Sequence, residues 1–434
     1  MKKKLEKKIQ KPKKEILNHK NRILIIVLCL CIATCIVLVI NVLIPYYKNY
    51  IKNKETEEYI ETIKNATIIV NLKEDLTTEF LSNVKTSDFI EEINGELTSD
   101  DIIETNIVGK KEVHFEYINE DNILIPYSFE IDIVDKTPPT LWLNDTKTVT
   151  VGISEEDLYE KITCADNYDD NPKCEIIGNY NLNRVGSYKL KYSASDNSGN
   201  ITEKNFTLNV VKPSSGGSSS SSRGSNPISD IIKEYKTDNT KIGIDVSAWQ
   251  GDIDFQAVKD SGVEFVFIRV GSTKGINAEY FVDSKFKQNI EGFNKVGIPV
   301  GIYFYSYANS KESAIKDAEW VIEQIKDYKV DLPIAYDWEN WSFYNNFHQS
   351  FYSTSMNAKA FLDTLNDAGY DGLLYSSASY LKRVWYDTTY PVWLAHYTDH
   401  TDYDGPYKYW QFCSNGKVPG IYGYVDMNIL YLDK

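Results

Sequence analysis

The stretch Ala335-Tyr-Asp-Trp-Glu339 closes an apolar run, residues 332–338, that we predict to be a buried β-strand. Asp337 and Glu339 are two residues apart, so on a strand their side chains point the same way. Further short apolar runs alternate with amphipathic stretches on both sides of this segment, which is typical of parallel βαβ units. We therefore predict an irregular α/β (β/α) barrel at residues 241–434.

The barrel is expected to contain eight strands, with helices in the gaps between the first five and only a short helix after the fifth. The predicted strands lie near residues 242–247, 264–270, 299–305, 332–338, 372–376, 391–396, 408–412 and 424–429. Stretches with apolar residues at helical spacing lie at residues 284–296, 310–327 and 355–369.

Two more acids occupy comparable positions. Asp245 ends the first strand, and Asp426 lies on the last. The first and last strands of a closed barrel are neighbours, so these two carboxylates are expected to be close together, at the end of a barrel where active sites form. Four crowded carboxylates cannot all ionise freely, so one would keep a proton near neutral pH and serve as a general acid. Pairs of this kind hydrolyse glycosidic bonds.

Other roles are open for these residues. Taken singly, Asp245 is compatible with a loop or capping role and Asp426 with a turn. A carboxylate cluster can also hold Mg²⁺ or Ca²⁺.

Several blocks, in order along the chain, resemble glycoside hydrolase family 25, the bacterial, phage and fungal muramidases. The blocks are Gly243-Ile-Asp-Val-Ser-Ala-Trp-Gln-Gly-Asp-Ile-Asp254, Phe267-Ile-Arg-Val-Gly271, Asp283-x-x-Phe286-x-x-Asn289, Gly301-Ile-Tyr-Phe-Tyr-Ser-Tyr-Ala308, Asp337-Trp-Glu339, Leu374-Tyr-Ser376, Trp393-Leu-Ala-His-Tyr397, Trp410-Gln411 and Val425-Asp-Met-Asn428. The resemblance covers the whole of the predicted barrel but under half of the chain.

This resemblance implies a lysozyme that cleaves the β-1,4 bond between N-acetylmuramic acid and N-acetylglucosamine in peptidoglycan, without a cofactor or metal. It implies that Glu339 is the general acid/base and that Asp337 orients the N-acetyl group or stabilises the intermediate. Asp245 and Asp426 would hold the sugar and tune the pair. The groove would be lined by Tyr303, Tyr305, Tyr375, Trp393 and Tyr397, for each of which barrel packing is the alternative role.

One block departs from the family pattern. Many members carry Lys-x-Thr-Glu-Gly after the second strand, where this chain reads Arg269-Val-Gly-Ser-Thr-Lys-Gly275. Arg and Lys are not equivalent, and the acid is missing, so substrate fit at this loop is expected to differ.

The N-terminus predicts a single-pass membrane anchor. Residues 1–22 form a basic segment with ten Lys or Arg, and an uncharged apolar run at residues 23–44 is long enough to span a bilayer. Basic flanks stay cytoplasmic, which places the rest of the chain on the cell-wall side of the membrane. A cleaved signal peptide is the alternative, but no small-residue cleavage site follows the run.

Between anchor and barrel we predict two small all-β domains and a linker. Period-2 alternation marks residues 50–136 and 137–212, for example in Val113–Tyr117, Tyr127–Val134 and Val185–Tyr192. The second segment, with its loop Asp196-Asn-Ser-Gly-Asn200, resembles bacterial immunoglobulin-like surface domains, and the first does so less clearly. Residues 213–240 are predicted to be a Ser/Gly-rich linker.

The amino-acid composition restricts the classes of molecule that the protein is expected to bind. The net charge is −15 in spite of the basic N-terminal segment, so the rest of the chain is strongly acidic and unsuited to nucleic acid. The 32 tyrosines suit either carbohydrate binding or strand packing. Cys164 and Cys174 are compatible with a disulfide or with two free thiols.

Three functions fit this organisation. The first is a membrane-anchored extracellular muramidase that acts on peptidoglycan glycan strands. The second is a catalytically inactive peptidoglycan-binding surface protein, and the third is an adhesin or stalk in which the barrel is a passenger. Because all four acids are present, the sequence favours the enzyme.

Overall fold

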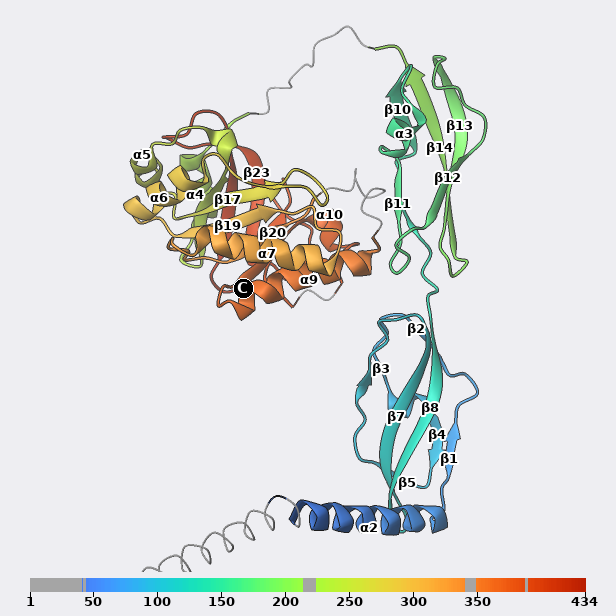
Figure 1. The fold of residues 1–434 in the computed structure, drawn as a ribbon. Coiled ribbons are helices and arrows are strands. Elements are labelled where there is room, and N and C mark those ends of the chain that lie inside the picture. The colour runs from blue at the N-terminus through green and yellow to red at the C-terminus, as the bar shows by residue number, and fades with distance from the viewer. Residues whose placement is uncertain (1–40, 42–43, 214–223, 340–348, 387–388) are drawn as a thin grey trace, which may run out of the picture. The chain divides into compact units, whose positions relative to one another are not determined.

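The computed structural model describes residues 41, 44–213, 224–339, 349–386 and 389–434 (Figure 1). The chain separates into two compact units, Met1–Val134 and Asp135–Lys434. Most of the predicted anchor at residues 23–44 lies outside the described residues, as does the basic segment 1–22. No helix in the part of the chain that is described combines the length and apolar character needed to cross a membrane.

The first unit begins with a helix and not with a strand. Helix α2 (Ile44–Asn65) occupies the start of the segment 50–136 that we predicted to be β-rich, so that boundary was wrong. Its sequence is rich in Lys and Glu, which are good helix formers, and Lys54 and Glu58 are spaced to form an i,i+4 ion pair. The β-structure begins only at Val70.

The remainder of the first unit is built on one long hairpin. Strands β7 (Gly109–Asn119) and β8 (Leu124–Val134) pair along their length within the sheet β2-β8-β7-β5. Val113, Phe115 and Tyr117 alternate inward, which confirms the predicted period-2 pattern. The shorter elements are β1 (Val70–Leu72), β2 (Thr77–Glu79), β3 (Val84–Lys85), η2 (Thr86–Phe89), β4 (Ile90–Ile93), β5 (Gly95–Leu97) and β6 (Ile102–Ile103).

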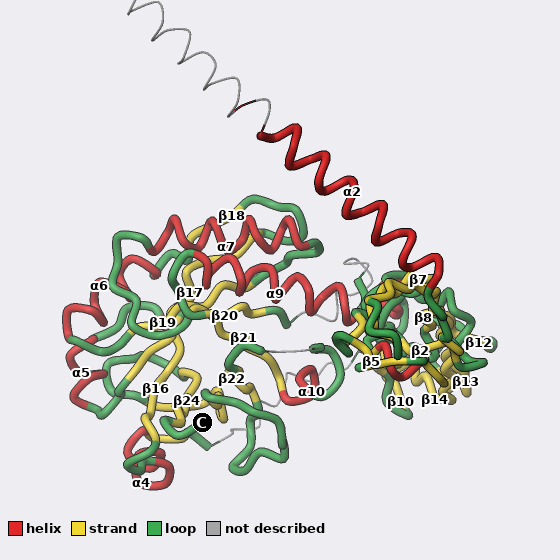
Figure 2. Tube along the Cα trace, turned by 90° about the horizontal axis from the view of Figure 1, so that it is seen from below, coloured by secondary structure: helices red, strands yellow, loops and turns green. Residues whose placement is uncertain are grey.

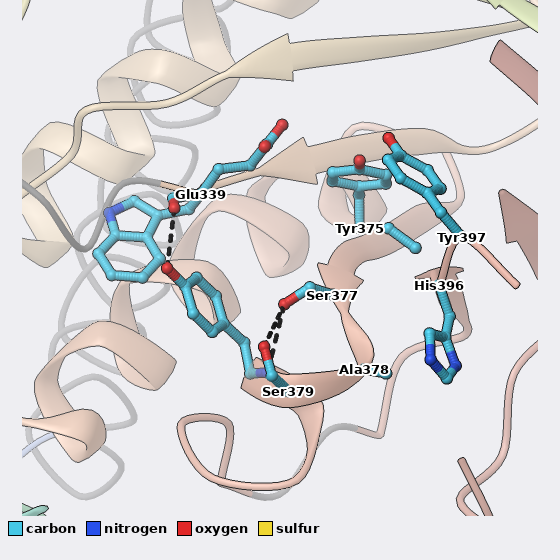
Figure 3. A pocket seen from close by; sticks show the side chains of 10 residues that line it. Glu339, Tyr375, Ser377, Ala378, Ser379, His396 and Tyr397 are labelled. Carbon is cyan, nitrogen blue, oxygen red and sulfur yellow. Dashed lines mark hydrogen bonds between the residues drawn. The ribbon is translucent and has the colours of Figure 1, made fainter. Parts of the chain in front are cut away.

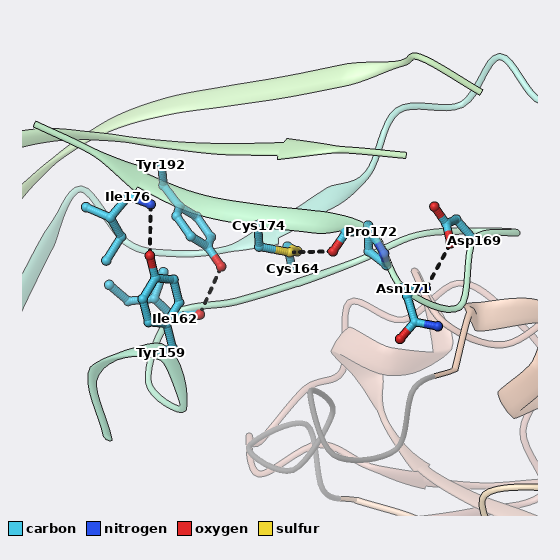
Figure 4. The surroundings of a disulfide bond; sticks show 9 residues. All are labelled: Tyr159, Ile162, Cys164, Asp169, Asn171, Pro172, Cys174, Ile176 and Tyr192. Atoms are coloured by element: carbon cyan, nitrogen blue, oxygen red, sulfur yellow. Dashed lines mark hydrogen bonds between the residues drawn. A yellow bond between two sulfur atoms is a disulfide. The ribbon is translucent and has the colours of Figure 1, made fainter. Parts of the chain in front are cut away.

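The second unit opens with another β-rich segment, which we call the β module (residues 135–211). Its elements are β9 (Thr140–Trp142), β10 (Thr146–Thr150), α3 (Glu155–Tyr159), β11 (Thr163–Ala165), β12 (Lys173–Ile177), β13 (Gly186–Ser195) and β14 (Ile201–Val211). The loop Asp196–Asn200 joins β13 to β14, as predicted for a hairpin. Cys164 and Cys174 form a disulfide between β11 and β12, beside the buried Tyr192 (Figure 4). Of the two alternatives for these cysteines, the structure therefore has the disulfide.

The barrel follows, and its eight strands lie where they were predicted. They are β16 (Thr240–Val246), β17 (Phe265–Thr273), β19 (Val300–Tyr305), β20 (Ile334–Asp337), β21 (Gly372–Ser377), β22 (Val392–Ala395), β23 (Tyr409–Lys417) and β24 (Val425–Tyr431). Each pairs with the next, and β24 pairs with both β16 and β23, which closes the sheet. Strand β24 runs antiparallel to both neighbours, a reversal that the sequence pattern did not predict.

Helices surround these strands. Figure 2 shows α5 (Phe255–Asp260), α6 (Phe286–Val296), α7 (Lys311–Ile325) and α9 (Phe351–Asp367) along the outside of the strands. As expected, these four occupy the gaps between the first five strands, and only the short α10 (Ala378–Leu381) follows the fifth. The remaining elements are η3 (Ala248–Gln250) and a strand that pairs with β17, β18 (Tyr280–Val282).

The predicted linker is shorter than its assigned range of 213–240. Residues 226–227 form β15, which pairs with β23, and residues 228–235 form helix α4. Ile228 and Ile231 are buried in the barrel core, so burial of this apolar face offsets the cost of ordering the segment. The Ser/Gly-rich residues 214–223 lie outside the described residues.

A glycine fixes the packing of the strand that carries two of the predicted site tyrosines. A Cβ at Gly301 of β19 would overlap the ring of Phe267 and lie 3.0 Å from the Pro333 carbonyl oxygen. We expect Gly301→Ala to lower the free energy of unfolding of the barrel by about 1–3 kcal/mol, because close-packed interiors do not absorb an added methyl group. Urea unfolding followed by tryptophan fluorescence measures this, since every tryptophan except Trp142 follows residue 240.

Gly224→Ala is the control, because a Cβ there meets no atom within 4 Å. Equal stability of the two variants would show that the close approach at Gly301 is not a constraint.

Candidate active site

Asp245 and Asp426 face each other across the strand pair that closes the barrel. In the antiparallel register of β16 and β24, Asp245 is the direct partner of Asp426. Because β24 runs in the reverse direction, its first residues lie at the end of the barrel where the parallel strands finish. The prediction that these two carboxylates are neighbours is confirmed, and the antiparallel strand explains how they meet.

Asp337 and Glu339 come from the end of β20. Asp337 is the last residue of the strand and is buried, whereas Glu339 lies two residues further and is exposed. The two carboxyl groups hydrogen-bond to each other, and both interact electrostatically with the pair on β16 and β24. The structure thus brings the four predicted acids together at one end of the barrel.

Burial raises the pKa of all four acids, and neighbouring negative charges add to the rise at Asp245, Asp337 and Asp426. Burial raises the pKa of Asp245 to about 6, against hydrogen bonds from Asn428 and Gln411 that lower it. Burial and the charge of Asp245 raise the pKa of Asp426 to about 8. Burial, followed by the charge of Glu339, raises the pKa of Asp337 well above its ordinary value.

The pKa of Glu339 also rises, although its side chain is exposed to the cleft. The walls of the cleft remove part of the hydration of its carboxyl group, and a hydrogen bond with Asp337 opposes the resulting shift. The same hydrogen bond raises the pKa of Asp337, so the two carboxyl groups titrate as a pair.

A hydrogen-bond network that we did not predict holds Asp245 in place. Gln411 Nε2 and Asn428 Nδ2 both donate to Asp245 Oδ2, at 2.9 and 2.8 Å. Tyr375 and Tyr397 each donate a hydroxyl to Gln411 Oε1, both at 2.9 Å. These two hydroxyl donors fix the orientation of the Gln411 amide, so its NH₂ group faces Asp245.

Gln411 and Asn428 were recognised only as parts of sequence blocks and not as site residues. The period of a strand was the available signal: Asn428 lies two residues after Asp426 on β24 and so shares its face. For Gln411, no comparable pattern pointed to the site.

A cavity of about 450 Å³ opens beside Glu339 (Figure 3). Tyr375 and Tyr397 line it, together with rim residues that carry hydroxyl or imidazole groups: Ser377, Ser379, Tyr380 and His396. In Figure 3 the Glu339 carboxylate and the two tyrosine rings lie on the same side of the cavity. Aromatic faces and hydroxyl groups together suit a carbohydrate ring, which has apolar faces and polar edges.

The other three residues predicted to line the groove take different positions. Tyr305, half-buried, lies close enough to Asp337 and Glu339 for their charges to raise its pKa further, after burial. Tyr303, also half-buried, is similarly placed beside Asp245. Trp393 is 1% exposed and stacks on Phe267 at 4.3 Å, while its indole N–H donates to Asn428 Oδ1 at 2.8 Å. The prediction that Trp393 lines the groove is corrected, because it supports the network from behind.

Arg269, where the sequence departs from the family pattern, forms an ion pair with Asp283. Its guanidinium pairs with Asp283, with N–O distances of 2.6 and 2.7 Å, and the Asp283 side chain is fully buried. Asp283 also accepts hydrogen bonds from the backbone N–H groups of Ala248 and Lys285. Held in this way, the positive charge of Arg269 acts on Asp337 and lowers its pKa, although burial outweighs it.

Comparison with known proteins places this domain in a family. Residues 244–421 match the model for glycosyl hydrolases family 25, so the chain contains a domain of that family, as the resemblance implied. The chain is 32% identical over 189 residues to an autolytic lysozyme of Clostridium acetobutylicum, a match that covers 43% of this chain and 54% of that protein. It is 26% identical over 218 residues to Lysozyme M1 of Streptomyces globisporus, covering 43% of this chain and 66% of that one.

Among solved structures, the modular autolysin LytC of Streptococcus pneumoniae is 28% identical, with 56% of each chain covered and a TM-score of 0.41. The chain therefore spans only about half the length of the first of these relatives, and the family match lies within the barrel.

The raised pKa of Asp426 predicts a stability that depends on pH. Because folding raises this pKa to about 8, from 3.8, the folded chain binds more protons than the unfolded chain between these values. Stability contributed by the neutral form is then lost as pH rises through this window. We expect Asp426→Asn to raise the Tm of the barrel at about pH 8.5 and to raise it much less at about pH 4.

Scanning calorimetry at the two pH values measures the difference, with the exposed Asp433→Asn as the control. A gain of the same size at both pH values, or no gain, would contradict the crowding of charge described for this site.

Proposed function

We propose that the family 25 domain makes this chain a membrane-anchored extracellular N-acetylmuramidase, which hydrolyses the β-1,4 bond between N-acetylmuramic acid and N-acetylglucosamine in peptidoglycan. The observation that carries the proposal is the arrangement of Asp337 and Glu339: two adjacent carboxyl groups with raised pKa values, one buried and one beside a cavity lined by aromatic side chains. The names of the two lysozymes that match the domain agree with it.

Each acid has a distinct role in the proposed reaction. Glu339, with a raised pKa and an exposed carboxyl group, donates a proton to the glycosidic oxygen as the bond breaks. Asp337 lies behind it, and its carboxyl group orients the N-acetyl group of the sugar or stabilises the charge that develops. Asp245 and Asp426 hold the sugar and tune this pair. With a pKa of about 6, Asp245 is largely ionised near neutral pH, and its negative charge stabilises a positively charged, oxocarbenium-like transition state.

Aromatic walls explain how a glycan strand is held next to these acids. Tyr375 and Tyr397 line the cavity, and their hydroxyl groups both donate to Gln411. A sugar ring therefore meets rings in a fixed orientation, which lowers the entropic cost of binding.

The rest of the chain fits a tethered enzyme. The basic segment 1–22 and the uncharged run 23–44 support an anchor with a cytoplasmic N-terminus. The two β-rich segments support a role as immunoglobulin-like spacers, and the Ser/Gly-rich residues 214–223 support a flexible connection to the barrel. In this proposal they extend the enzyme from the membrane towards the wall.

Replacing the proposed acid tests the assignment. We expect Glu339→Gln to reduce the release of soluble fragments from purified peptidoglycan by at least about a thousand-fold, because the amide cannot donate the proton. The control is Glu323→Gln, an exposed glutamate on α7 outside the cleft. Circular dichroism checks that both variants are folded.

Retained activity in Glu339→Gln would overturn the role of Glu339. A folded native chain that binds peptidoglycan but releases nothing would favour the alternative of a catalytically inactive wall-binding protein.

The network around Asp245 gives a second test. Gln411→Met keeps the size of the side chain but removes the hydrogen bond to Asp245 and leaves two tyrosine hydroxyls without their acceptor. Since a hydrogen bond to a charged group contributes about 1.5–3 kcal/mol, we expect kcat/KM to fall by about ten- to a hundred-fold. Gln288→Met, at an exposed position on α6, is the matched control. Unchanged kcat/KM in Gln411→Met would show that the network does not orient the site.

A further inference from the structure

A second group of acids lies in the β module, outside the barrel. Asp135 precedes β9, Asp166 follows β11, and Asp196 begins the loop between β13 and β14. One carboxylate oxygen from each lies within 4.8 Å of the others, and all three residues are buried. Three segments that are about 30 residues apart in the sequence thus each place a carboxylate in the same small region of the fold.

Asp166 shows that this group is not fully compensated by hydrogen bonds. The residue is 0% exposed. Its Oδ2 accepts hydrogen bonds from the backbone N–H groups of Tyr168 and Asp169, at 2.9 and 2.7 Å, but its Oδ1 is buried and has no donor. A buried carboxylate oxygen without a partner is costly, and such a group in a native protein requires an explanation.

The side-chain amide of the next residue, Asn167, also has a buried oxygen without a hydrogen-bond donor. Asn167 is also buried, and its Nδ2 donates to Asp135 Oδ1 at 2.9 Å, which places the amide against the acids. Its own Oδ1 is buried without a donor. Two acceptor oxygens, one from a carboxylate and one from an amide, therefore lack a positive partner at the same place.

No basic side chain in the described part of the chain forms an ion pair with Asp166 or Asp196. Asp196 is held instead by Asn200, whose backbone N–H and Nδ2 both donate to it at 2.8 Å. Burial raises the pKa of Asp166 to about 6, and the charges of Asp135 and Asp196 add to the rise. Near neutral pH Asp166 therefore remains mostly ionised, although it is buried against two other carboxyl groups.

We propose that Asp135, Asp166 and Asp196 form a Ca²⁺ site that joins the three segments of the β module. Carboxylate and amide oxygens are the ligands that hard divalent cations prefer. Ca²⁺ accepts the irregular geometry that ligands from three separate loops provide, whereas Mg²⁺ demands a near-ideal octahedron. Binding replaces the repulsion between the carboxylates with attraction to one ion, and it stiffens the module by fixing the start of β9, the β11–β12 loop and the β13–β14 hairpin together.

Equilibrium dialysis of the purified full chain with radioactive Ca²⁺ tests the site. We expect the native chain to bind one more Ca²⁺ than Asp166→Asn, whose affinity at this position falls by at least about ten-fold. Glu160→Gln, an exposed change in the same module, serves as the matched control and should bind like the native chain. Equal stoichiometry in the native chain and Asp166→Asn would overturn the proposal, and a preference for Mg²⁺ over Ca²⁺ would overturn the choice of ion.

Calorimetry separates a metal site from a purely structural cluster. In EDTA, Asp166→Asn should raise the Tm of the β module, because it removes one of three repelling charges. With Ca²⁺ added, the native module should gain stability and the variant should not. A lower Tm of the variant in both conditions would mean that Asp166 acts only through its backbone hydrogen bonds. Asp196→Asn, which keeps an acceptor for Asn200, repeats the comparison should Asp166→Asn fail to fold.

Discussion

The pairing of β24 with both β16 and β23 is the constraint on which the candidate active site depends. It closes the barrel, and its antiparallel direction brings Asp426 opposite Asp245 at the end where the parallel strands finish. A parallel strand in the same place would put the start of β24 at the other end of the barrel. One reversal of chain direction therefore completes the set of four acids that β16 and β20 begin.

Assembling these acids costs stability, and the surrounding residues determine which of them keeps a proton. Asp245 accepts hydrogen bonds from two side-chain amides, which limit the rise of its pKa to about 6. The pKa of Asp426 rises to about 8, because burial and the charges of Asp245 and Glu339 all raise it. Asp337 is buried while Glu339 is exposed beside the cavity, so the two carboxyl groups of this pair have opposed environments. Opposed environments for adjacent carboxyl groups are the usual basis of acid and base roles in one site.

Much of this architecture could be predicted from the sequence, because the barrel strands are short apolar runs that end in acids, and the helices between them have clear apolar stripes. There are physical reasons why some elements and site residues were not predicted. Helix α4 has apolar residues at helical spacing, Ile228, Ile231, Ile232 and Tyr235, but it directly follows the Ser/Gly-rich stretch and was assigned to the linker with it. Helix α2 consists largely of charged helix formers and has only a weak apolar period. Gln411 was overlooked because its role depends on contacts with Asp245 and Tyr375, far away in sequence. The same is true of Asp135, Asp166 and Asp196, which only the folded module brings together.

We propose that the barrel cleaves the bond that follows N-acetylmuramic acid. Mass spectrometry of the fragments that the full chain releases from purified peptidoglycan tests it most directly, because hydrolysis leaves a new reducing end on one sugar or the other. We expect the new reducing ends to be on N-acetylmuramic acid. New reducing ends on N-acetylglucosamine would contradict this proposal.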